Sequence, residues 1–280
     1  MSAIRRRALA GHAAGESSTG HGRMGPGREP SRDAGARTLT GFGPVLPNPA
    51  LYVVRLPERE DPDPVLAARW LQRAERERFE RFRQARDRWR LLLGRILLRH
   101  VLTVRYGMAD VQIAVSRWGR PFLPSLGSAG LDFNITHAGA WVGVGVTRVG
   151  AIGVDIVAES ELTDWEHLAE HFLGPDERRE IHMAPPQSRR VLAARAWVAK
   201  EAVLKAAGYG LEVDPRAVVL ELRPAVRVRQ MPEALPEPAC LHLHEPGLPD
   251  RYCAAIACLG NNPCHYRNEV TELDSRRLVG

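Results

Sequence analysis

The sequence predicts an α+β fold made of two similar halves, which form a pseudo-twofold monomer and meet near residue 150. The chain has 280 residues, of which 44% are hydrophobic and 26% charged, so it can bury a sizeable core. Segments with strand-like alternation and segments with helical spacing follow one another in the order strand, helices, strands. That order then occurs a second time, which favours two related α+β units.

The first unit is expected at residues 47–150. It opens with the strand-like run LYVVRL at Leu51. A long helical stretch is expected next, because apolar residues recur at three- and four-residue steps through 65–82. A second helix is expected at about 88–105, because Trp89 and the leucines after it form one apolar stripe. Three short apolar runs complete the unit as strands, at 111–115, 131–135 and 141–146.

The second unit is expected at residues 151–260 and opens with the strand AIGVDIV at 151–157. Helices should follow at 160–172, 175–182 and 188–207, and strands near 217–222, 240–244 and 252–259. Residues 261–280 are expected to form a tail.

The N-terminal segment, residues 1–46, is expected to be disordered. It is rich in Gly, Ser, Arg and Pro and has no hydrophobic periodicity, so it cannot bury enough apolar surface to offset its ordering entropy. No apolar run of the chain approaches the roughly 20 residues that span a bilayer, and no secretory signal opens the sequence. We therefore expect a cytoplasmic protein that does not bind membranes.

The net charge indicates only the general class of partner, and the cysteine spacing indicates the redox state of the thiols. A formal net charge of +6 favours an anionic partner, which nucleic acid, a phosphorylated cofactor and an acidic protein all satisfy. No C-x-x-C pair occurs, so the four cysteines are expected to be reduced thiols: Cys240, Cys253, Cys258 and Cys264.

The expected helix at 188–207 carries charges on an otherwise apolar sequence. In WVAKEAVLK, Trp197, Glu201 and Lys205 are four residues apart and share one helical face, with Lys200 one position round. Unpaired buried charge is expensive, so these groups indicate either a functional site or an ion pair on a solvated edge.

Three other segments carry candidate functional groups. Asp155 stands inside an apolar strand, a position typical of a metal ligand, a catalytic group or a cap on the strand's exit turn. Thr136 and His137 end the run FNITH and stand just past the expected strand, although a single histidine is more often structural. The turn Gly119-Arg120-Pro121 presents one cation.

Together these four segments resemble the 4'-phosphopantetheinyl transferase superfamily, in its Sfp-type (surfactin-synthetase-activating) branch. The family pattern is G-K/R-P, F-N-x-S/T-H, G-x-D and W-x-x-K-E-x-x-x-K, and this sequence matches it at 119–121, 133–137, 153–155 and 197–205. The resemblance extends over about residues 48–260. It implies Mg²⁺-dependent transfer of 4'-phosphopantetheine from coenzyme A to a serine of an apo acyl or peptidyl carrier protein, with release of 3',5'-ADP.

The resemblance also implies roles for individual residues. Asp155 and Glu201 are expected to bind Mg²⁺, and Glu201 is also the expected general base toward the carrier serine. Lys205 and His137 are expected to hold phosphates and to take part in catalysis, with Lys205 stabilising the departing 3',5'-ADP. The other expected coenzyme A contacts are Arg78 and Arg90 at the 3'-phosphate, Arg120 and Pro121 at the adenine, and Thr136 and Lys200.

One position departs from the family pattern. Larger members read G-x-D-x-E, and Val157 stands here in place of the second acid. Two carboxylates then remain, with water completing the shell that Mg²⁺ requires. Glu159, two residues further on, is an alternative ligand.

Two other functions remain as alternatives. A zinc-binding hydrolase is suggested by the H-x-x-E-H match at 167–171 and by the alternating residues Cys240, His242 and His244. A nucleic-acid-binding protein is suggested by the arginine-dense region 69–105, but acidic residues interrupt it and it lacks interleaved aromatics. A basic helix face also suits acidic carrier proteins, which are the expected partners instead of nucleic acid.

Overall fold

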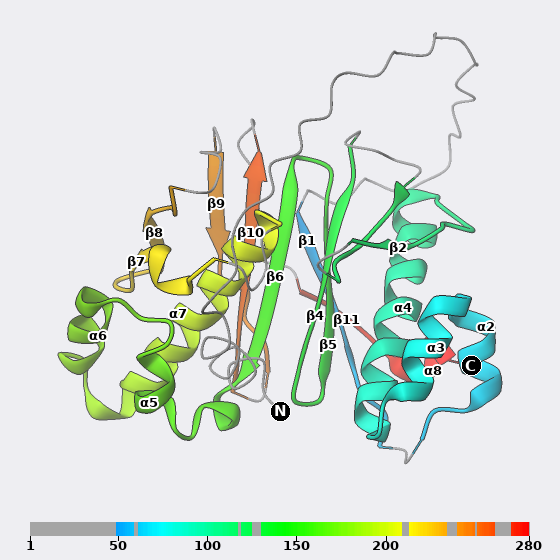
Figure 1. Cartoon of the computed structure of the whole chain (residues 1–280), viewed down its shortest axis with the longest axis horizontal. Coiled ribbons are helices and arrows are strands. Elements are labelled where there is room, and N and C mark those ends of the chain that lie inside the picture. The colour runs from blue at the N-terminus through cyan, green and yellow to red at the C-terminus, as the bar shows by residue number, and fades with distance from the viewer. Residues whose placement is uncertain are drawn as a thin grey trace, which may run out of the picture.

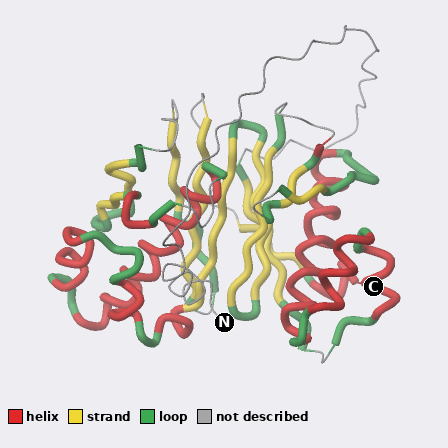
Figure 2. Tube along the Cα trace, in the orientation of Figure 1, coloured by secondary structure: helices red, strands yellow, loops and turns green. Residues whose placement is uncertain are grey.

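The computed structural model describes residues 49–58, 61–116, 119–124, 130–208, 213–233, 240–249, 251–260 and 270–279. Two β-sheets lie side by side at its centre, and helices cover the outer face of each (Figures 1 and 2). Sheets and helices are segregated in this way in α+β proteins, so the predicted fold class is confirmed.

The sheet of the first half has the strand order β11-β1-β5-β4. Its members are β1 (Ala50–Arg55), β4 (Asp132–Ala138), β5 (Trp141–Thr147) and β11 (Val270–Leu273). Strand β5 runs antiparallel to both β1 and β4. Helix α4 (Ala85–Tyr106) packs on one face of this sheet, and α2 (Pro64–Trp70) and α3 (Arg73–Arg81) pack on α4. A separate two-stranded ribbon pairs β2 (Ala114–Val115) with β3 (Pro121–Phe122).

The sheet of the second half has the strand order β6-β10-β9. Its strands are β6 (Ala151–Ala158), β9 (Cys240–His244) and β10 (Tyr252–Gly260). The long helix α7 (Pro186–Ala206) packs on this sheet. The remaining elements of this half lie on the outer side of α7: η2 (Glu159–Leu162), α5 (Trp165–Ala169), α6 (Pro175–His182), η3 (Pro215–Ala217) and the ribbon of β7 (Val219–Glu221) and β8 (Arg227–Gln230).

The two halves share an apolar interface between their sheets. Alternation along β1 sends Tyr52 and Val54 toward α4 and sends Leu51 and Val53 into a second cluster with β6 and β10. Gly145 of β5 permits this approach, since a Cβ there would lie 2.3 Å from Cγ1 of Val154. The interface therefore depends on close packing of the two sheets.

Most of the expected elements occur, with shifted boundaries. The helix expected at 175–182 has those bounds. The stretch 65–82 is two helices, because the backbone is extended at Leu71 and α3 starts anew after Gln72, whose amide donates to Oε2 of Glu75 at 3.0 Å. The helix expected at 160–172 is likewise replaced by η2 and α5. The expected disordered segment 1–46 lies outside the described residues.

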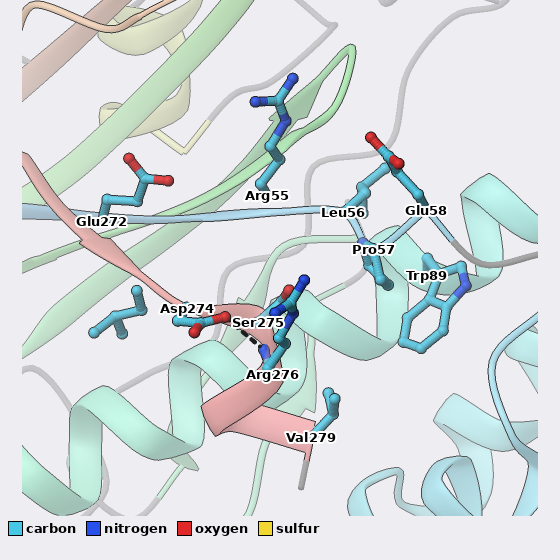
Figure 3. Close-up of a pocket in the computed structure, with 11 residues that line it drawn as sticks. Arg55, Leu56, Pro57, Glu58, Trp89, Glu272, Asp274, Ser275, Arg276 and Val279 are labelled. Atoms are coloured by element: carbon cyan, nitrogen blue, oxygen red, sulfur yellow. Dashed lines mark hydrogen bonds between the residues drawn. The ribbon is translucent and has the colours of Figure 1, made fainter.

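The prediction of a C-terminal tail at 261–280 is wrong for its described part. Strand β11 pairs in parallel with β1, with Leu51 opposite Val270, and helix α8 (Ser275–Val279) buries Leu278 in the core of the first half. Residues 272–276 of this segment and Val279 line a cavity of about 1160 Å³ together with Arg55 and Trp89 (Figure 3). None of its lining residues belongs to the site expected from the sequence.

No helix in the described part of the chain combines the length and the apolar composition needed to cross a membrane.

Candidate active site

Helix α7 lies directly against strand β6 at Gly153. A Cβ at this position would lie 2.0 Å from the carbonyl oxygen of Ala202 and 2.4 Å from the amide nitrogen of Ala206. Only glycine allows the two backbones to approach so closely. This contact brings the WVAKEAVLK face of the helix onto the strand that carries Asp155.

Asp155 is buried, with 4% of its surface exposed, and two side chains contact one of its oxygens. Nζ of Lys205 donates to Oδ1 of Asp155 at 2.5 Å and to the carbonyl of Val154 at 3.1 Å. The hydroxyl of Thr136, on β4, donates to the same Oδ1 at 3.1 Å. The structure thus brings together three of the expected site residues from two strands and a helix.

The second carboxylate oxygen of Asp155 is the feature that points to a bound cation. Oδ2 is buried and accepts no hydrogen bond from the described residues, which is costly for a carboxylate. Glu201, one turn before Lys205 on the same helical face, is 6% exposed. Carboxylate oxygens are the ligands that Mg²⁺ prefers, so Asp155 and Glu201 fit this metal.

The described part of the chain offers at most two acids to such a metal shell. Among the residues that the structure describes, no three His, Cys, Asp or Glu side chains are grouped closely enough to hold a metal ion. Val157 is buried in the core beside α7, and Glu159 lies 3.7 Å from a guanidinium nitrogen of Arg190. Water and substrate oxygens would have to complete the shell, which Mg²⁺ tolerates.

His137 lies on the opposite face of β4 from Thr136. The strand continues to Ala138, so neighbouring side chains alternate, and His137 is exposed on the side of Ile135, against which α4 packs. The structure therefore does not bring His137 to Asp155. It places His137 on the face that α4 covers, and α4 carries Arg90.

Arg90 is held at the turn between β4 and β5. Its Nη2 donates to the carbonyl of Gly139 at 3.1 Å, and its Nη1 lies 3.2 Å from Asp87. Burial lowers the pKa of Arg90, and repulsion from Arg86 lowers it further. A partly buried cation at this turn suits an anionic ligand.

Sequence reasoning missed one acid at this turn, Glu161. Its Oε1 accepts a hydrogen bond from the amide of Gly139 at 3.2 Å, and its charge offsets part of the lowering of the Arg90 pKa that burial causes. None of the sequence motifs includes Glu161, so the sequence did not distinguish it as a candidate site residue. Arg78, expected near Arg90, is exposed on α3 with its guanidinium 5.8 Å from the ring centre of Phe82.

Lys200 was expected to contact coenzyme A, and its position corrects this. The side chain is fully buried on another face of α7, where Nζ lies 2.7 Å from Oε2 of Glu177 and 3.2 Å from the carbonyl of Pro215. One residue corresponds to about 100° around a helix, so the neighbour of Glu201 points toward α6 and η3 instead of β6. Burial lowers the pKa of Lys200, and the charge of Glu177 opposes that shift.

Arg120, expected at the adenine, bonds to other parts of the protein in the structure. Its guanidinium donates to Asp132 at 2.6 Å, to the carbonyl of Ile152 at 3.0 Å and to the carbonyl of Lys205. These protein acceptors take up both terminal nitrogens of the side chain. Pro121, expected at the adenine with it, is half-buried in β3.

The residues behind the zinc hypotheses belong to other elements, α5 and the residues after it, and strand β9. His167 and His171 stack edge to face on and after α5, with ring centres 5.6 Å apart. The side chain of Cys240 lies outside the described residues, and Cys253 and Cys258 are free thiols.

Comparisons with known proteins identify a family for both halves of the chain. The model of the 4'-phosphopantetheinyl transferase superfamily matches residues 151–257, and that of the 4'-phosphopantetheinyl transferase N-terminal region matches residues 58–148. The chain is 29% identical to the 4'-phosphopantetheinyl transferase ffp of Bacillus subtilis over 210 residues, 73% of this chain and 90% of the relative.

Other relatives align over about half of their length. The phosphopantetheinyl transferase of Thraustochytrium is 33% identical over 50% of this chain and 54% of its own. Sfp of Bacillus subtilis is 29% identical over 49% of this chain and 60% of its own. A solved holo-(acyl-carrier-protein) synthase from Bacillus anthracis, in complex with CoA (3',5'-ADP), is 21% identical with a TM-score of 0.35, covering 41% of this chain and 98% of its own. The chain belongs to the 4'-phosphopantetheinyl transferase superfamily, in the branch that includes Sfp and ffp.

Proposed function

We propose that this protein transfers 4'-phosphopantetheine from coenzyme A to a serine of an apo carrier protein and requires Mg²⁺. The observation that carries the proposal is the environment of Asp155. Lys205 and Thr136 contact one of its oxygens, and the other is buried without a hydrogen-bond partner among the described residues. Such an arrangement fits a cation held against a phosphate-rich substrate.

Asp155 and Glu201 would hold the metal ion. A bound Mg²⁺ would neutralise the negative charge that develops on the pyrophosphate of coenzyme A. Glu201 accepts the proton of the serine hydroxyl as the new bond from serine oxygen to phosphorus forms. The bond between that phosphorus and the bridging oxygen breaks, and 3',5'-ADP leaves. The ammonium of Lys205, whose side chain is 24% exposed, stabilises the leaving phosphate.

The basic groups of the first half would recognise the rest of coenzyme A and the carrier. Arg90 and His137 lie on the α4 side of β4, where they would meet phosphate groups of the substrate. The net charge of +6 would steer an acidic carrier protein toward the enzyme. The cytoplasmic location and the monomeric state expected from the sequence stay predictions.

The test is incubation with coenzyme A, Mg²⁺ and several apo carrier proteins, followed by intact-mass spectrometry of the carrier. The expected result is a gain of one phosphopantetheine, which disappears with a chelator or with a carrier whose acceptor serine is alanine. Failure to modify any of several diverse carriers would contradict the function and leave the fold unaffected.

A further inference from the structure

Strands β4 and β6 belong to different sheets, yet side chains of β4 bond to β6 along its length. Oδ2 of Asp132 accepts a hydrogen bond from the amide of Ile152 at 2.8 Å, and Oδ1 of Asn134 accepts one from the amide of Val154 at 3.1 Å. Thr136 then donates to Asp155. Three alternate residues of β4 thus bond to β6 through their side chains, in a row that ends at the carboxylate of the site.

Arg120 joins this row to the end of helix α7. Its Nη2 bonds to the same Oδ2 of Asp132 at 2.6 Å and to the carbonyl of Ile152 at 3.0 Å, while its Nη1 bonds to the carbonyl of Lys205. One guanidinium therefore connects β4 in the first half with β6 and α7 in the second. Only 20% of the side chain is exposed, so water competes weakly for these bonds.

We infer that Arg120 and Asp132 form a latch between the two halves and act as positioning residues that set the geometry of Asp155 and Lys205. The latch fixes the main chain of Lys205, whose ammonium contacts Asp155 on the facing strand. This inference rests on the proposed function for its effect on turnover. It assigns the guanidinium to holding α7 against β6 instead of to recognising adenine.

The two roles predict different kinetics. A group that recognises the base changes the preference between coenzyme A and an analogue with a modified base, and it does so through KM. If Arg120 instead positions the reacting groups, its substitution misplaces them and lowers kcat equally for both substrates. Lysine at position 120 keeps one cation but lacks the planar fork, so Arg120→Lys should restore only part of the loss.

The experiment compares Arg120→Met, Arg120→Lys, Asp132→Asn and the double variant Arg120→Met/Asp132→Asn. Each is assayed with coenzyme A and with 1,N6-etheno-coenzyme A, whose adenine amino nitrogen is blocked. Arg120→Met should lower kcat at least about tenfold with both substrates, the effect of losing a hydrogen-bonded charge. The double variant should lose no more than about twofold beyond Arg120→Met, because the two side chains act as a unit.

A second readout needs neither substrate nor metal. Hydrogen exchange of the Ile152 amide, measured on the full chain, should be at least about tenfold faster in Arg120→Met, since this amide bonds to the acid that Arg120 holds. The matched control is Arg179→Met, which removes an exposed arginine 2.7 Å from Asp176. It should leave both kcat and exchange unchanged.

Three results would overturn the latch. They are unchanged exchange of Ile152 in Arg120→Met, additive losses in the double variant, and a loss confined to the KM of coenzyme A relative to its etheno analogue. Arg120→Lys supplies the same readouts if the methionine variant does not fold. A wild-type enzyme that transfers nothing contradicts the proposed function, and the exchange measurement still decides the latch.

Discussion

The contact between Gly153 and helix α7 makes Gly153→Ala a direct test of how the site is assembled. The added Cβ would lie 2.0 Å from the carbonyl oxygen of Ala202, whereas ordinary contacts begin at 3.4 Å. This oxygen and the other close atom, the amide nitrogen of Ala206, belong to the backbone of α7, so no side chain can rotate away. Strand β6 and helix α7 must separate by more than 1 Å, about the difference between those distances.

That separation has two measurable consequences. Overpacking of a core costs about 1–3 kcal/mol of unfolding free energy. The bond of 2.5 Å between Lys205 and Asp155 also lengthens beyond hydrogen-bonding range. A misplacement of about 1 Å at reacting groups can reduce turnover about 100-fold. We therefore expect Gly153→Ala to be destabilised by about 1–3 kcal/mol and, per folded molecule, to lose about 100-fold in transfer rate.

Urea unfolding and carrier-modification rates measure the two effects, with two alanine substitutions as controls. Gly247→Ala places its Cβ with no heavy atom within 4 Å and should match the wild type. Gly145→Ala meets Cγ1 of Val154 at 2.3 Å in the interface between sheets, so it should lose stability but less turnover than Gly153→Ala. Wild-type stability and turnover in Gly153→Ala would refute the idea that α7 rests on this glycine.

Three further predictions concern single side chains. Glu201→Gln should reduce turnover at least about 100-fold, because a positioned base supplies 10²–10⁴-fold, and near-normal turnover would remove Glu201 from this role. Lys200→Met should destabilise the protein by about 3–5 kcal/mol, because it leaves the buried charge of Glu177 without its cation. The KM for coenzyme A of the folded enzyme should stay unchanged, and an increased KM would return Lys200 to the binding site. Burial raises the pKa of the Cys253 thiol from 9.0 to about 11, so over this interval the unfolded chain loses the proton first and the free energy of unfolding falls as pH rises. Unfolding curves of Cys253→Ala should show a weaker fall between these pH values, and an identical pH dependence would contradict the assignment.

The sequence was most informative where local periodicity and a short motif coincide. Lys205 and Glu201 share a helical face through their spacing, and Asp155 interrupts an apolar strand, so the sequence alone marks all three as candidate site residues. Lys200 could not be placed in the same way. Helix α7 is buried on several faces, and the sequence does not distinguish the face toward β6 from the face toward Glu177.

Non-local contacts explain the remaining differences. Strand β11 is the four-residue segment VTEL, too short to show a period, and its partner β1 lies more than 200 residues earlier in the chain. Asp132 begins a strand, where an acid usually indicates a turn, and only the structure shows that it bonds to β6. The face of the sheet on which His137 lies could have been predicted. Extending the strand expected at 131–135 by three residues puts Thr136 and His137 on opposite faces.

The most direct test of the proposed site compares wild-type protein with Asp155→Asn in one measurement, the intact mass of an apo carrier protein after incubation with coenzyme A and Mg²⁺. The substitution preserves size but removes the charge that Lys205 contacts and that a metal would require. We expect the wild type to add one phosphopantetheine and Asp155→Asn to add none in the same time. Equal modification by both proteins would contradict the claim that the reaction takes place at Asp155.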